Sequence, residues 1–167
     1  MSEARSVAGD AAGAEDLVRR SLPAAERYET LAAMLHTSLA RSLLDLDRIE
    51  EAVSLIGPLE EAAARRKRDS GRLSADVEVY RVAADVYSRV GDHLRAAELV
   101  AAAQALVAPT EWLYVKADVE LTRSRVLFGA GDRIAARAAV GEARRLYQTK
   151  GHLPGIAAAE ALLQVSF

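Results

Sequence analysis

The chain has 167 residues, of which 51% are hydrophobic and 28% charged, and its formal net charge is -2. Its length and composition are those of one folded globular domain, and the slight negative charge argues against a dedicated nucleic-acid surface. There is no cysteine, which excludes disulfides, zinc–thiolate sites and thiol catalysis.

The sequence shows no targeting or membrane signal. The first 22 residues carry charges throughout, unlike a secretory signal peptide. The longest apolar run, around Leu99 to Ala108, is interrupted by Gln104 and is too short to cross a bilayer. These features predict a cytoplasmic protein with no membrane partner.

Apolar residues recur three and four positions apart along almost the whole chain. That spacing places them on one face of an α-helix, whereas no stretch alternates in the manner of a half-buried strand. The pattern predicts an all-α fold of about seven to eight helices.

Helix-breaking residues mark the predicted joints between helices in the first half of the chain. Residues 10–21 read as one helix, and Ser21 with Pro23 is predicted to open another that runs to about Leu44. Pro58 and the glycine before it fall inside a helical pattern. Proline lacks an N–H and clashes with the preceding turn, which predicts a kink or break there.

The second half of the chain has further joints. An Asp-Ser-Gly turn precedes a predicted helix whose N-cap is Ser74. Pro109 precedes another predicted helix, whose N-cap is Thr110. Gly151 and Pro154 mark the last joint, after which one helix is predicted to run to Val165.

A turn motif recurs along the chain, with a small residue five positions after the turn residue. The motif begins at Gly9, Asp47, Gly91 and Gly131, and the small residues are Ala14, Ala52, Ala96 and Ala136. The copies are 38, 44 and 40 residues apart. One helix pair cannot bury both of its apolar faces, so the repeat predicts neighbouring pairs that stack on one another.

These residues resemble the tetratricopeptide (TPR) repeat family, whose turn and packing positions are matched best between Tyr80 and Pro109. The matching residues are Tyr80, Ala83, Ala84, Tyr87, Gly91, Ala96, Val100, Ala103 and Pro109. The likeness covers roughly residues 9–150 and is nearest to the long-helix units in sensor regions of bacterial transcriptional activators and signalling ATPases.

The resemblance implies a TPR-like α-solenoid, a right-handed superhelical stack of antiparallel helix pairs. It implies one domain over residues 1–167, with a half repeat and frayed N-terminus at 1–22. Three repeats follow at 23–70, 71–109 and 110–150, and a capping helix lies at 151–167.

In the TPR family the first helix of each pair lines a concave groove. Carrying those positions across gives a predicted groove formed by Arg41, Leu44, Arg81, Asp85, Arg89, Leu121, Arg125 and Phe128. Arginine forks suit carboxylate or phosphate recognition, so the groove is expected to bind a protein or peptide. In the alternative interpretation the arginines pair with Glu78, Asp85 and Asp118 across helices.

No catalytic, metal or cofactor site is predicted. The histidines His36, His93 and His152 lie in different units and lack metal-ligand spacing. The carboxylates are interpreted as lying on solvated helix faces. They lack the burial or the perturbing neighbour that a catalytic acid needs. The chain is therefore expected not to be an enzyme, and a site of unrecognised type is the alternative.

The leading hypothesis is a scaffold or sensor module of a bacterial regulator that binds a peptide or partner helix. The alternative is a nucleic-acid-associated transcriptional regulator that uses the basic run Arg65-Arg66-Lys67-Arg68. That run also suits a helix C-terminus, where cations offset exposed carbonyls. The incomplete first repeat further predicts a homo-oligomer.

Overall fold

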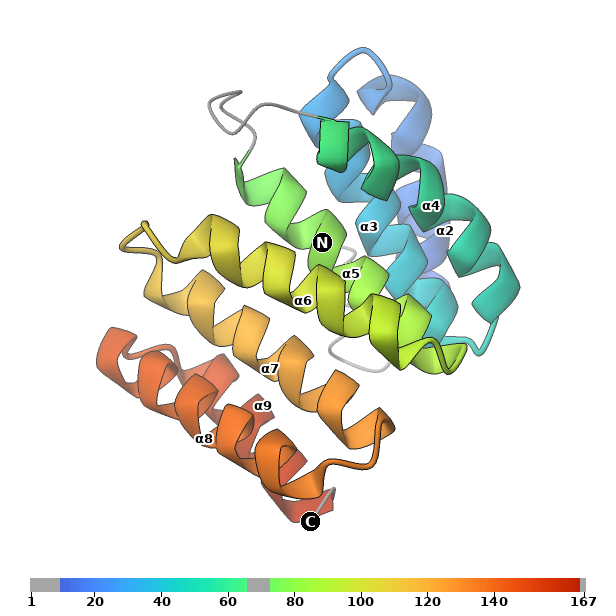
Figure 1. Cartoon of the computed structure of the whole chain (residues 1–167). Coiled ribbons are helices and arrows are strands. Elements are labelled where there is room, and N and C mark those ends of the chain that lie inside the picture. The colour runs from blue at the N-terminus through green and yellow to red at the C-terminus, as the bar shows by residue number, and fades with distance from the viewer. Residues whose placement is uncertain (1–9, 66–72, 166–167) are drawn as a thin grey trace. The chain divides into compact units, whose positions relative to one another are not determined.

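The computed structural model describes residues 10–65 and 73–165, and within these ranges all regular structure is α-helical. Eight helices are present there (Figure 1): α2 (Ala11–Ala25), α3 (Glu29–Asp45), α4 (Ile49–Arg65), α5 (Leu73–Arg89), α6 (His93–Val107), α7 (Leu113–Gly129), α8 (Arg133–Lys150) and α9 (Leu153–Val165). The predicted all-α class is confirmed. None of these eight helices is both long enough and apolar enough to span a bilayer.

The described residues form two compact units that meet at the bond between Val86 and Tyr87, inside α5. In the first unit α3 packs against both α2 and α4. In the second unit α7 packs against α6, α8 and α9, and α8 also packs against α9. Alanines let the helices of each unit approach closely, and the small residues of the turn motif are all fully buried: Ala14, Ala52, Ala96 and Ala136.

The turns at Gly91 and Gly131 are equivalent, which confirms the repeat between them. Their φ angles are 85° and 86°, a left-handed conformation that glycine adopts at no steric cost. In each turn the glycine amide donates to the carbonyl three residues earlier, and the next amide donates to the carbonyl five residues earlier (2.9 Å in both). Asp92 and Asp132 then cap α6 and α8, since each Oδ1 accepts an amide hydrogen bond of 3.0 Å.

The first unit keeps the turn but changes its chemistry. Asp47 stands in place of the glycine with φ 59°, a conformation that Asp tolerates better than most residues. Arg48 stands where the capping aspartate would be, and its side chain donates to Glu51 and Glu15 instead. Gly9 lies outside the described residues, but Asp10 caps α2 by accepting from the Gly13 amide at 2.8 Å.

The predicted helix opening at Ser21 and Pro23 is wrong, because α2 continues through both residues to Ala25 and α3 begins only at Glu29. Pro23 lies in the last turn of α2, where its missing N–H costs a single backbone hydrogen bond. Ala25 is buried beyond it, so packing holds the last turn in helical form.

The predicted break at Pro58 is also absent, because α4 runs unbroken from Ile49 to Arg65. Ile56 and Glu60 are buried on either side of Pro58, whereas the proline itself is exposed. The packed face holds the helix together across the one position that lacks a donor.

Two predicted N-caps are wrong. Ser74 lies inside the first turn of α5, which begins at Leu73. Thr110 precedes α7, which begins at Leu113, and its hydroxyl accepts from the Trp112 amide at 3.3 Å within the connecting turn. The final helix, predicted over Pro154 to Val165, is found one residue longer as α9.

Candidate functional site

Two arginines of the predicted groove, both in the first unit, form hydrogen bonds with the same glutamate. Arg41 Nη2 donates to Glu78 Oε1 at 2.6 Å, and Arg81 Nη1 donates to Glu78 Oε2 at 2.7 Å. The alternative interpretation, in which arginines pair with acidic residues across helices, is confirmed for Arg41 of α3, whereas Arg81 pairs with Glu78 within α5. Leu44 is buried and Asp85 is partly buried, so Leu44 does not offer the apolar contact that was predicted.

The other four predicted groove residues belong to the second unit. Leu121 is buried in the core formed by α7, α8 and α9, which contradicts its predicted role as a contact for a partner. Arg125 Nη2 donates to Thr122 Oγ1 at 3.1 Å. Arg89 and Phe128 are exposed, so they are the two members of the predicted groove that a partner could readily reach.

Two of the three histidines make local hydrogen bonds. His36 Nδ1 lies 2.8 Å from the Ala32 carbonyl oxygen, and His152 Nδ1 accepts from the Gly155 amide at 3.1 Å. His93 Nδ1 is buried without a hydrogen-bond partner. Within residues 10–65 and 73–165, no three His, Asp or Glu side chains gather in a way that could hold a metal ion.

Ion pairs with arginines lower the pKa of three carboxyl groups. Hydrogen bonds from Arg19 and Arg48 lower the pKa of Glu15, and that from Arg48 lowers the pKa of Glu51. Arg145 lowers the pKa of Glu142 in the same way. Each shift keeps the carboxylate ionised, whereas a general acid at neutral pH needs a raised pKa.

The basic run predicted as a nucleic-acid patch is only partly described. Arg65 ends α4 and pairs with Glu61 at 3.4 Å, while residues 66–68 lie outside the described residues. An arginine at the last turn of a helix has the local role of offsetting exposed carbonyls.

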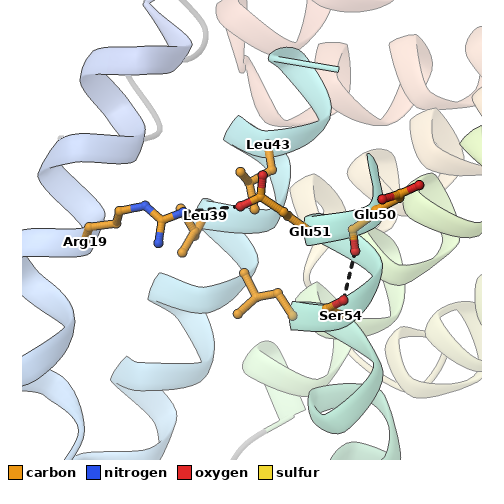
Figure 2. Close-up of a pocket in the computed structure, with 7 residues that line it drawn as sticks. Arg19, Leu39, Leu43, Glu50, Glu51 and Ser54 are labelled. Carbon is orange, nitrogen blue, oxygen red and sulfur yellow. Dashed lines mark hydrogen bonds and ion pairs between the residues drawn. The ribbon is translucent and has the colours of Figure 1, made fainter. Parts of the chain in front are cut away.

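A cleft of about 470 Å³ opens in the first unit between α2 and α4, with α3 beneath it (Figure 2). Arg19 and Glu51 point toward each other, and their closest N and O atoms are 3.9 Å apart. Three leucines line the cleft, of which Leu39 and Leu43 are buried and Leu55 is partly buried. The cleft therefore offers a ligand limited apolar surface on which to gain hydrophobic free energy.

Exposed apolar side chains lie at the start of α3, at Tyr28, Leu31 and Met34, and on the turns of the second unit. The residues on the turns are Val90 (50% exposed), Leu94 (76%), Phe128 (38%) and Ile134 (87%), and we call them the turn patch. Leu94 and Ile134 occupy equivalent positions, each two residues after the capping aspartate of its helix. The side chains there point away from the core because the buried alanine of the motif comes two residues later.

The two turns that carry the patch lie at the same end of the second unit (Figure 1). A Cβ added to Gly129 would lie 2.8 Å from Ser88 Oγ and 3.2 Å from His93 Cε1. Arg133 lies beside the patch, with its guanidinium carbon 5.6 Å from the centroid of the Phe128 ring. The exposed apolar side chains of the patch therefore stand on two neighbouring turns, with an arginine beside Phe128.

The prediction from sequence included Phe128 but missed the other three members of the turn patch. A signal was present, because both Leu94 and Ile134 are large apolar residues at a repeated position that faces away from the motif alanine. Comparisons of the chain with protein-family models, with curated proteins and with solved structures find no match. The function must therefore be inferred from the residues of the chain itself.

Proposed function

We propose that the chain is a non-enzymatic, tetratricopeptide-like repeat module that holds a partner protein through the turn patch. The proposal includes stacking of the helix pairs in a right-handed superhelix and the role of a scaffold or sensor part of a bacterial regulator, as the sequence resemblance implies.

The exposure of the turn patch is the observation that carries this proposal. Single exposed apolar residues are ordinary, but contiguous apolar surface with polar neighbours marks interaction sites. Leu94 and Ile134 project at 76% and 87% exposure, so a partner that covers them removes most of their apolar area from water. Each fully covered side chain of this size contributes about 1.5–3 kcal/mol.

The shape of the patch favours a protein partner over a small molecule. Small ligands are held in concave pockets that bury most of their surface, whereas these side chains stand on the outside of two turns. Protein interfaces commonly combine an apolar centre with aromatic and arginine contacts, and Phe128 with Arg133 supplies that combination.

Selection of binders from a random-peptide display library on the intact chain tests the proposal. The affinity of each selected peptide is then measured for a Leu94→Ser/Ile134→Ser variant and for a Leu153→Ser control. Leu153 is 75% exposed at the start of α9, so it matches the patch residues in size and exposure. Binding should be lost in the double variant and kept in the control.

The folded state should tolerate both variants because the replaced side chains make few contacts. Equal thermal unfolding temperatures would establish that point. Peptides that bind the double variant as tightly as the native chain, or a library that yields no binder, would refute the turn patch as a binding surface.

A further inference from the structure

The charges around the turn patch indicate what kind of partner it fits, provided that the proposed function holds. We infer that the partner is an acidic amphipathic protein segment, with carboxylates placed around an apolar centre. The local charge around the patch is opposite in sign to that of the whole chain.

The two turn segments, residues 87–95 and 128–137, contain four arginines and two aspartates, a formal net charge of +2 with His93 neutral. The chain as a whole carries -2. The positive residues of these segments are Arg89, Arg95, Arg133 and Arg137. Glu98, which pairs with Arg95, reduces this local charge to +1, which is still opposite in sign to that of the chain. A positive surface on a negative chain orients an acidic partner toward this end of the second unit.

The two aspartates are turned toward the helices. Asp92 accepts from the Arg95 amide and Asp132 from the Ala135 amide, each at 3.0 Å. Their negative charge is therefore held against the positive N-terminal ends of α6 and α8. Arg95 pairs with Glu98 at 2.7 Å, whereas Arg133 is exposed and lies beside Phe128 at the edge of the patch.

Arg133 and Phe128 together suit a carboxylate that sits next to an apolar side chain. The ring orients the guanidinium by a cation–π contact, and the planar fork can donate two parallel hydrogen bonds to one carboxylate. Leu94 and Ile134 then receive the apolar side chains of the partner. A basic segment would meet like charge at the same place.

The test uses the tightest peptide from the display selection and a second version in which Asn and Gln replace its Asp and Glu. Both are titrated against the native chain, an Arg133→Gln variant and an Arg144→Gln control. Arg144 is an exposed arginine of α8 outside the two turn segments. We expect the selected peptides to be rich in Asp and Glu.

Arg133→Gln should weaken the acidic peptide about twofold to fivefold, the range of one exposed ion pair. The neutral peptide should bind more weakly and should be indifferent to Arg133→Gln, and Arg144→Gln should change neither peptide. Selected peptides without an acidic excess, or equal binding to native chain and Arg133→Gln, would overturn the inference. The proposed function would survive that outcome, provided that binding still required Leu94 and Ile134.

Two further measurements separate other occupants of the patch. Sedimentation equilibrium of the intact chain tests whether a second copy occupies the patch. A dimer that Leu94→Ser/Ile134→Ser abolished would identify the second copy as the occupant. Cosedimentation with phosphatidylcholine vesicles containing about 30% phosphatidylserine would reveal a lipid surface, if binding depended on the same residues. Either result would overturn the inference, and we expect neither.

Discussion

Gly155 is the position where the structure makes its sharpest prediction about stability. A Cβ built on Gly155 would lie 2.5 Å from both Cδ1 and Cε1 of the Tyr147 ring and 2.6 Å from His152 Nδ1. Carbon atoms in contact prefer about 3.5–4.0 Å, so the Ala variant brings them roughly 1 Å too close. Gly155→Ala should therefore strain the contact between α8 and α9.

The Tyr147 ring has little room to move away. It is 1% exposed, its hydroxyl donates to Asp118, and its centroid lies 5.3 Å from that of His152. Overpacking of this kind costs about 1–3 kcal/mol, which exceeds the gain of about 0.5–1 kcal/mol from removing a helical glycine. The net effect should be destabilisation by up to about 2 kcal/mol.

Gly141 provides the matched control in the same unit. It lies within α8, and an added Cβ there would meet no atom within 4 Å. Gly141→Ala should therefore stabilise the chain by about 0.5–1 kcal/mol. In a chain of this size, about 1 kcal/mol shifts the melting temperature by roughly 2–4 °C, so the two variants should move Tm in opposite directions.

Thermal unfolding followed by circular dichroism, with urea titration as a second measure, gives both values. A double variant adds a test of cause. In a Tyr147→Leu background the ring is gone, and Gly155→Ala should lose the part of its cost that comes from the ring, while the clash with His152 Nδ1 remains. Equal stability of Gly155→Ala and Gly141→Ala, or a cost that is undiminished without the ring, would contradict the contact drawn between α8 and α9.

Three further substitutions or conditions test other parts of the structure. Ala96→Leu should lower the urea midpoint by an amount equivalent to about 1–3 kcal/mol, with the m-value unchanged, because Ala96 is fully buried where helices cross. Asp132→Ala should lower the free energy of unfolding by about 0.5–2 kcal/mol through loss of the α8 cap, and Asp132→Ser should recover most of that stability. Urea titration measures both variants, and an unaffected midpoint for Asp132→Ala would count against the cap. Arginine partners lower the pKa of Glu15, Glu51 and Glu142 below the ordinary 4.5, so the stabilisation is present above about pH 4.5 and is lost as the pH falls further. Replacing all three by Gln should flatten that loss in unfolding experiments across the acidic range, and an unchanged pH profile would show that these pairs do not contribute.

The candidate site was only partly predictable, and the arginines show why. The family positions placed Arg41 and Arg81 in one predicted groove, but they do not say that Glu78 would come within 2.6 and 2.7 Å of the two arginines. Phe128 belongs both to the predicted groove and to the turn patch. Leu121 has the same helical period as its neighbours, yet α8 and α9 cover it.

The residue pattern by itself determined the helical class, the turns at Gly91 and Gly131 and the buried alanines of the turn motif. These are local properties, because apolar period, positive φ and side-chain size act within a few residues. Tertiary structure alone decided that α2 would pass through Pro23 and α4 through Pro58. A proline removes about one backbone hydrogen bond, and only the packing of residues far along the chain determines whether a helix withstands that loss. The same packing determines which apolar residues remain uncovered, and so it placed Leu94 and Ile134 at the surface.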